Sequence, residues 1–293
     1  MVRRGPAQWG REDPPAQARA DLDILIPCYG RPAELAVTLS GLAAQPAPGF
    51  RVLMSDQSPS PVAEEPAVAA MIRLLRAQGR PVQVWRNLPR RGMAHQRQVL
   101  LERSRADHVL YLDSDVWLEP GTPGRLLDAI RASGAGFVGA AVQGLSYLGD
   151  RRPADWELFR PWDGPVRPEP APRQGPAAER WRLHNAANLA HLAARWHLSD
   201  TDRLLYRVAW VGGCVLFDRQ VLVECGGFDF WDRLPEEHAG EDVLAQWRVM
   251  ERRGGAGILP SGAVHLEAPT TITERGCDAR TLWGETSDGP AAP

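Results

Sequence analysis

An alternation of short apolar runs with helical patterns through the first 112 residues most constrains the fold of this chain. Residues 23–27 form a mainly apolar run, as expected for a strand that is buried on both faces. From Pro32, leucines recur at helical spacing until two nearby prolines. Strands that alternate with helices indicate an α/β fold, with a mainly parallel sheet and helices on its faces. Further strands are expected at 50–55, 82–86 and 108–112, and further helices at 68–78 and 92–105.

The second half of the chain is less regular. Residues 145–207 are dense in Trp, Pro, Arg and Asp, and only one helix is expected there, near residues 178–196. Beyond this stretch, short apolar runs and one helical pattern indicate a return of regular structure. The apolar runs lie at 208–211, 214–217, 257–259 and 263–265, and the expected helix lies at 242–252.

Composition and charge exclude several classes of protein. The formal net charge is -2 and neither sign forms long runs, so nothing indicates binding to nucleic acid or a polybasic membrane anchor. No segment approaches the roughly 18 apolar residues of a membrane-spanning helix, although peripheral contact with a membrane is compatible with the sequence. The four cysteines form no C-x-x-C pair, which disfavours structural zinc and disulfides. We therefore expect a soluble, cytoplasmic protein with small-molecule ligands; the sequence does not indicate its oligomeric state.

Two carboxylates directly follow the expected fourth strand. Asp113 and Asp115 lie in the segment YLDSDV, and side chains at positions i and i+2 of an extended backbone point the same way. Both can therefore hold one hard cation, Mg²⁺ or Mn²⁺, which in turn can carry the diphosphate oxygens of a nucleotide. The alternative is an ordinary turn at a strand end, where Asp and Ser are common. A motif this short does not decide between the two by itself.

Three further blocks accompany this motif, and together the four resemble the family 2 glycosyltransferases of the A-type fold. In chain order the blocks are LDILIPCYGRPAELAVTLSGLAAQ, VLMSDQS, NLPRRGMAHQRQVLLERSRADHVLYLDSDVWLEPG and WVGGCVLFDRQVLVECGGFDFWDRLPEEHAGEDVLAQWRV. They span about residues 21–267 and leave out the stretch at 145–207. The resemblance implies a Rossmann-like, mainly parallel sheet flanked by helices, with a smaller subregion on the acceptor side.

The resemblance also implies a division of the chain. Both ends are polar and contain several prolines, so we expect poorly ordered tails there. The expected parts are an N-terminal tail at 1–20, a glycosyltransferase domain at 21–275 and a C-terminal tail at 276–293. Within the domain they are a nucleotide-binding half at 21–120, an insert at 145–207 and an acceptor and catalytic half at 208–267.

The activity that the resemblance implies is inverting glycosyl transfer. A sugar moves from a nucleotide-diphospho-sugar, with a UDP-sugar favoured, to a hydroxyl group of a glycan, a lipid-linked sugar or a small molecule, with Mn²⁺ or Mg²⁺ as cofactor. In the family the Asp of a Glu-Asp pair is the general base, which here is Asp242 after Glu241. Burial near a second carboxylate raises the pKa of such a base, as its role requires. These acidic residues also suit the first turn of a helix, and both readings can hold together.

Donor binding is implied for several residues of the first three blocks. The resemblance places Pro27 and Tyr29 beside the nucleotide base and gives Asp56 a hydrogen bond from the base, which a carboxylate accepts well. The alternative for Asp56 is a turn cap, and the alternative for Arg97 is an exposed position on its helix. The complete implied donor set is Pro27, Tyr29, Asp56, Arg97, Asp113 and Ser114.

Acceptor and metal contacts are implied in the second half of the chain. Glycine lets a sugar ring approach the backbone, and the aromatic face of Trp210 can pack on its C–H surface, although Trp210 also suits an ordinary core. His265 is either a further metal ligand or a satisfied structural histidine. Gly30, Gln57 and Gln98 depart from the family pattern, which leaves base and sugar specificity open. The implied acceptor set is Trp210, Gly212, Gly213 and Glu241, and the implied metal set is Asp113, Asp115 and His265.

Two other functions fit parts of the same pattern. A sugar-phosphate nucleotidyltransferase shares the nucleotide, the metal and a similar sheet, but it carries a Gly-rich basic loop after the first strand, where this chain has PCYG. A non-catalytic nucleotide-sugar binding protein can have the same fold, since fold does not establish function. The presence of both the metal pair and the Glu-Asp pair argues against it. An NAD-dependent enzyme is disfavoured because no G-x-G-x-x-G follows a strand.

Overall fold

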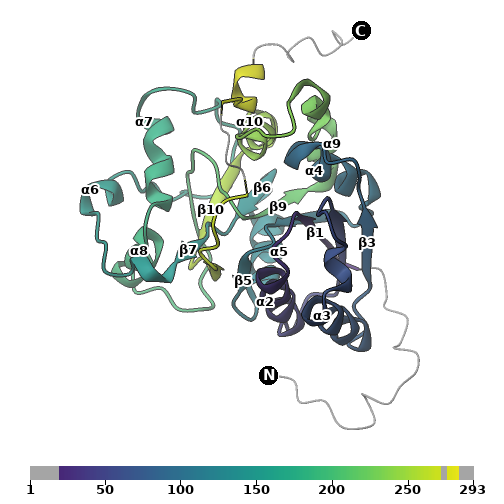
Figure 1. Ribbon diagram of the computed structural model, residues 1–293. Coiled ribbons are helices and arrows are strands. Elements are labelled where there is room, and N and C mark those ends of the chain that lie inside the picture. The colour runs from purple at the N-terminus through teal and green to yellow at the C-terminus, as the bar shows by residue number, and fades with distance from the viewer. Residues whose placement is uncertain (1–19, 272–275, 284–293) are drawn as a thin grey trace.

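The computed structural model describes residues 20–271 and 276–283. The expected tail at 1–20 and the end of the chain beyond residue 283 therefore lie almost entirely outside the described residues. Helices cover both faces of a central sheet, with α2, α3 and α5 on one side and α4, α9 and α10 on the other (Figure 1). No helix of the described part of the chain is long and apolar enough to cross a membrane.

The central sheet has eight strands in the order β3-β2-β1-β4-β9-β6-β10-β8. The first four neighbours run parallel, β9 runs antiparallel to both β4 and β6, β10 runs parallel to β6, and β8 closes the edge antiparallel to β10. The expected α/β fold with a mainly parallel sheet is confirmed. The strands are β1 (Leu22–Cys28), β2 (Phe50–Asp56), β3 (Val82–Arg86), β4 (His108–Leu112), β6 (Phe137–Gly139), β8 (Leu204–Tyr206), β9 (Cys214–Asp218) and β10 (Gly255–Leu259).

A second sheet of three short strands stands beside the first, in the order β5-β11-β7. It joins β5 (Val116–Leu118) antiparallel to β11 (Ala263–His265), which runs parallel to β7 (Gln143–Gly144). Because β5 begins just after the acidic motif and β11 ends on a histidine, this small sheet brings two distant parts of the chain together.

The helices explain why the central strands are mainly apolar on both faces. In β1, Ile24 and Ile26 pack into one hydrophobic core and Leu25 packs into the other, so neither face meets water. The α-helices are α2 (Pro32–Ala43), α3 (Pro66–Ala77), α4 (Gly92–Arg103), α5 (Thr122–Ser133), α6 (Pro153–Trp156), α7 (Gly175–Ala178), α8 (Asn188–Arg195), α9 (Arg219–Glu224) and α10 (Glu241–Arg253). Short 3₁₀ helices lie at Val62–Glu64, Leu145–Tyr147, Glu179–His184, Asp229–Arg233 and Ala279–Leu282.

Two expected elements differ in the structure. The single helix expected at 178–196 is divided into α7, a 3₁₀ helix and α8, because Ala186 has a left-handed backbone (φ 50) that interrupts the helix. The apolar run at 208–211 is not a strand. There the side chain of Gln246 bonds both the N–H and the carbonyl of Val211, at 2.8 Å each, in place of a neighbouring strand.

The segment before the C-terminus also differs from the expectation of a poorly ordered tail. Among residues 276–283, Ala279 is fully buried and the Trp283 ring meets the Trp247 ring edge-on, with centroids 5.9 Å apart. Ala239 and Asp278 form an isolated β-bridge. This segment therefore packs against the start of α10, because its apolar residues find a place in the core there.

Candidate active site

The acidic motif is fixed by backbone pairing between β4 and the segment before β9. The N–H of Asp113 donates to the carbonyl of Gly213 at 2.9 Å. Gly213 has a left-handed backbone (φ 78), and an added Cβ would lie 2.6 Å from a methyl group of Val142. Only glycine fits this position without strain. Gly213 thus lets the segment before β9 pass close enough to the acidic motif to bond its backbone.

A cleft opens at the carboxyl ends of β1 and β4. It contains about 840 Å³ of space between the side chains, part of which is open solvent. Among residues expected from the sequence, its lining includes Pro27, Tyr29, Asp113, Ser114, Asp115 and His265. The lining also includes residues that the sequence did not single out, namely Arg31, Met93, Ala268, Thr270 and Thr271.

Asp115 lies in this cleft between a guanidinium and an imidazole. Its Oδ2 atom is 2.5 Å from Nη1 of Arg31 and 3.4 Å from Nε2 of His265. Burial alone would raise the pKa of Asp115, but the hydrogen bond from His265 and the charges of His265 and Arg31 outweigh burial and lower this pKa. Asp115 is therefore ionised at neutral pH.

The histidine is turned toward this carboxylate. The backbone N–H of Glu267 donates to Nδ1 of His265 at 2.9 Å, so the proton of the neutral ring lies on Nε2, which faces Asp115. The hydrogen bond to Asp115 raises the pKa of His265. His265 can coordinate a cation through Nε2 only after giving up that proton.

A cation fits this end of the cleft by the chemistry of the groups that line it. Carboxylates are the preferred ligands of Mg²⁺ and suit Mn²⁺, and imidazole is a competent ligand for Mn²⁺. Asp113 is the more open of the two carboxylates, with 35% of its side chain exposed against 6% for Asp115. Across the described residues, no three His, Cys, Asp or Glu side chains are grouped closely enough to hold a metal ion as they stand. The group now bound to Asp115 is the Arg31 guanidinium.

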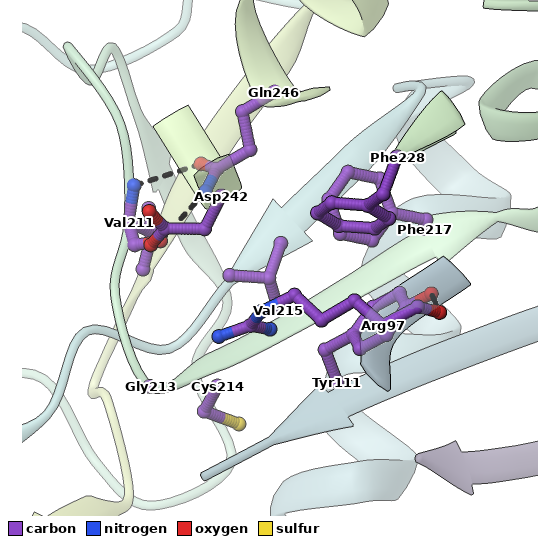
Figure 2. A pocket seen from close by; sticks show the side chains of 10 residues that line it. All are labelled: Arg97, Tyr111, Val211, Gly213, Cys214, Val215, Phe217, Phe228, Asp242 and Gln246. Carbon is purple, nitrogen blue, oxygen red and sulfur yellow. Dashed lines mark hydrogen bonds between the residues drawn. The ribbon is translucent and has the colours of Figure 1, made fainter. Parts of the chain in front are cut away.

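A second acidic centre lies at the start of α10. Asp242 borders a small, tightly lined pocket together with Arg97, Gly213 and Gln246 (Figure 2). Burial and the adjacent Glu241 carboxylate raise the pKa of Asp242 to about 7, while Arg97 opposes this rise. The carboxyl group can therefore exchange a proton near neutral pH.

A family model described as glycosyl transferase family 2 matches residues 23–186, more than half of the chain. The chain belongs to the family 2 glycosyltransferases. This match confirms the resemblance to the family; it covers nearly all of the first three sequence blocks, whereas the fourth block, at 210–249, lies beyond the matched residues. No curated protein sequence matches the chain.

Solved structures show the A-type glycosyltransferase fold. Mannosyltransferase PcManGT from Pyrobaculum calidifontis, in complex with GDP-Man and Mn²⁺, has a TM-score of 0.53 and 16% identity over 91% of this chain and 64% of its own. Residues 1–349 of S. aureus TarS give a TM-score of 0.52 and 16% identity over 84% and 60% of the two chains. The same TarS fragment with UDP-GlcNAc gives 0.51 and 15% identity over 86% and 60%. The chain thus spans less than two thirds of each of these solved chains.

Arg97 connects the two acidic centres of this family 2 glycosyltransferase. Its Nη2 is 3.1 Å from Oδ1 of Asp113, and its Nε is 3.3 Å from Oε1 of Glu241. Burial alone would lower the pKa of Arg97, but the charges of Asp113 and Glu241 outweigh burial and raise it, so the guanidinium stays charged. Arg97 is buried, and the alternative of an exposed position on its helix does not apply.

Asp56 has the contacts of a turn cap. It is fully buried, and its two oxygens accept hydrogen bonds from the N–H groups of Ser58 at 2.8 Å and Val62 at 2.9 Å. Arg86 lies 2.5 Å from the same carboxylate. The structure does not bring Asp56 to the lining of the cleft, so its contact with a nucleotide base stays a prediction.

The residues expected to bind the acceptor do not line the cleft. Trp210 is half-buried, and its ring meets His184 edge-on with centroids 6.4 Å apart. An added Cβ on Gly212 would lie 3.2 Å from the Trp210 ring, so the glycine leaves room for that ring. Their contact with an acceptor stays a prediction. Glu241, which was expected beside the acceptor, is buried and paired with Arg97.

Two site residues were missed in the sequence. Arg31 stands two positions after Tyr29 within the first block, and this proximity to an expected site residue was the available signal. His238 lies three positions before Glu241 and bonds helix α4 through the N–H of Ala94, at 3.1 Å. Only the folded chain shows that contact, since 144 positions separate the two partners.

Proposed function

We propose that this chain is an inverting glycosyltransferase that moves a sugar from a nucleotide-diphospho-sugar to a hydroxyl acceptor, with Asp242 as the general base. The observation that carries the proposal is the ion-pair chain from Asp113 through Arg97 to Glu241, which ties the cleft to the start of α10. Asp242, whose carboxyl group has a pKa of about 7, directly follows Glu241 in the sequence. A cleft for the donor and a base for the acceptor therefore stand side by side.

The chemistry of the proposed step follows from this arrangement. Asp242 takes the proton from the acceptor hydroxyl, whose oxygen attacks the anomeric carbon on the face opposite the diphosphate. The bond from that carbon to the diphosphate oxygen breaks, and the configuration inverts. A base with a pKa near the working pH is unprotonated in about half of the molecules and still accepts protons well, and it contributes about 10²–10⁴-fold in rate.

We propose Mn²⁺ or Mg²⁺ as cofactor, held by Asp113 and Asp115 with His265 as a further ligand. When bound, the cation neutralises charge on the departing diphosphate. The ionised state of Asp115 and the ligand types support this assignment. The PcManGT structure, which contains GDP-Man and Mn²⁺, supports a divalent metal in the family.

For the donor we propose the cleft from Pro27 and Tyr29 to Ser114, with residues 21–120 as the nucleotide-binding half. A UDP-sugar is the favoured donor, in line with the TarS complex with UDP-GlcNAc. We assign the acceptor to residues 208–267 and give the segment at 145–207 a role in acceptor choice. The acceptor hydroxyl belongs to a glycan, a lipid-linked sugar or a small molecule.

The substitution Asp242→Asn tests the function. We expect transfer to fall by about 10²-fold or more, because the amide cannot take a proton. Donor binding, measured by thermal shift with UDP- and GDP-sugars and Mn²⁺, should persist. The matched control is Asp128→Asn, an exposed carboxylate on α5 that should transfer normally. Full turnover by the Asp242 variant would refute the assignment. Release of a nucleoside diphosphate distinguishes transfer from nucleotidyl transfer, which forms pyrophosphate.

A further inference from the structure

Arg31 has an unusual backbone at the entrance to the cleft. It precedes α2 with φ 55 and ψ 51, and Gly30 before it also has a positive φ of 65. Two successive left-handed residues make a sharp turn after β1. Residues other than glycine rarely adopt this conformation, and where they do they are often part of a functional site. The turn directs the Arg31 side chain into the cleft, where it lines the wall.

The guanidinium of Arg31 occupies the position beside Asp115 that a metal ion would need. Nη1 donates to Oδ2 of Asp115 at 2.5 Å, and Nη2 donates to the carbonyl of Pro269. The Arg31 side chain is 17% exposed and that of Asp115 is 6% exposed, so water screens the pair weakly. A divalent cation cannot coordinate the same oxygen while the guanidinium remains there, because two positive charges would stand in contact. Arg31 must therefore move away before a cation can coordinate Oδ2 of Asp115.

The same cleft offers Arg31 a second partner. Among the described residues that line it, Arg31 carries the only guanidinium, opposite the carboxylates of Asp113 and Asp115. A nucleoside diphosphate brings negative charge into this space, and guanidinium groups bind phosphate oxygens in a bidentate manner. Resting on the proposed function, we propose that Arg31 holds Asp115 in the free enzyme and passes to the donor diphosphate when the divalent cation takes Asp115.

This exchange makes metal and nucleotide binding interdependent. In the free enzyme, Arg31 competes with the cation and weakens its binding. Once a diphosphate engages Arg31, that competition ends and the cation binds more tightly. By linkage, the cation strengthens nucleotide binding by the same factor. Arg31 is thus a positioning residue that favours loading of the metal together with the donor.

The test measures Mn²⁺ binding without nucleotide, by the electron paramagnetic resonance signal of free Mn²⁺. We expect Arg31→Gln to bind Mn²⁺ about tenfold more tightly than the wild type, and to bind UDP about tenfold more weakly at saturating Mn²⁺. Arg31→Lys keeps the charge and should stay near the wild type in Mn²⁺ affinity. Arg51→Gln is the matched control, because Arg51 pairs at 2.6 Å with a fully buried carboxylate, Asp23, at the opposite ends of the strands.

The outcomes separate this inference from the proposed function. If the wild type binds Mn²⁺ and Arg31→Gln binds it no more tightly, the exchange is refuted and the transferase proposal stands. Unchanged UDP affinity of the Arg31→Gln variant at saturating Mn²⁺ refutes the second half of the exchange. If the wild type binds neither Mn²⁺ nor UDP- or GDP-sugars, the proposed function and this inference both fail. Thermal unfolding of each variant, followed by circular dichroism, identifies any loss of binding that comes from unfolding.

Discussion

At the scale of single residues, the site depends on carboxylates whose charges are set by their neighbours. Asp115 is kept ionised by Arg31 and His265, whereas Asp242 is pushed toward the protonated form by burial and Glu241. Arg97 moderates the second effect, since it pairs with Glu241 and lowers the pKa of Asp242. One carboxylate is thus suited to hold a cation and the other to accept a proton.

This difference predicts the pH dependence of transfer. The proposed base acts only when it is unprotonated, and the pKa of Asp242 is about 7, so kcat/KM should rise with pH through about 7. Glu241→Gln removes the negative charge that raises the pKa of Asp242, so the midpoint of the rise in kcat/KM should move to lower pH. Glu251→Gln, an exposed change on the same helix, is the control and should leave the midpoint in place. A profile of the Glu241 variant that coincides with the wild type would contradict the assigned cause.

At the scale of elements, His238 holds the segment before α10 against α4. Its Nδ1–H donates to the carbonyl of Pro235 at 2.7 Å, and its Nε2 accepts from the N–H of Ala94 at 3.1 Å. The Ala94 N–H belongs to the first turn of α4, where helices lack internal partners. Gly92 makes the contact possible, because an added Cβ would lie 2.4 Å from the carbonyl oxygen of Glu236. The neutral ring is required, since a protonated Nε2 cannot accept.

This contact predicts a pH-dependent loss of stability. Burial lowers the pKa of His238, so the unfolded chain binds more protons below about pH 6.5 and the stabilisation fades as pH falls. His238→Ala should therefore reduce the free energy of unfolding by about 1–3 kcal/mol at pH 7.5 and by less at pH 5.5. Urea unfolding at both pH values measures the difference. The control is His197→Ala, an exposed position, which should show neither effect. If His238→Ala lowers the free energy of unfolding equally at both pH values, the contact does not depend on the neutral form of the ring.

Most strands and helices of the first half of the chain could be predicted from the sequence. Strands β1 to β4 and helices α2 to α4 followed from periodicity, because each apolar run is covered by helices on both faces. The run at 208–211 was not recognised as a loop, because a buried loop is as apolar as a strand. Its backbone is bonded by side chains of the distant helix α10, Gln246 and Trp247. The acidic residues of the cleft were found by motif. Arg31 was not, since its direction depends on a left-handed turn that spacing does not reveal.

At the scale of the whole molecule, the segment at 145–207 is built into the domain. Phe159, Leu183 and Tyr206 belong to the same hydrophobic core as Tyr111 of β4, and β8 pairs with β10 in the central sheet. Deletion of this segment would therefore remove part of the core and an edge strand. Its role in acceptor choice has to be tested by substitutions at its exposed residues, such as Trp181 and Trp196.

The integration of this segment predicts one cooperative unfolding transition. Asp155 is buried within it and binds Arg182 at 2.5 Å and Asn188 at 3.4 Å. In Asp155→Ala these donors lose their partner, which should cost about 1–3 kcal/mol, since Arg182 keeps partial access to water. Because the segment shares its core with the sheet, the whole transition should move to lower urea concentration with its slope unchanged. Trp fluorescence and circular dichroism should give the same midpoint, and the exposed change Asp163→Ala should leave it in place. Two separate transitions would show instead that the segment unfolds as an independent unit, and the sheet would then keep its stability when the Asp155 contacts are lost.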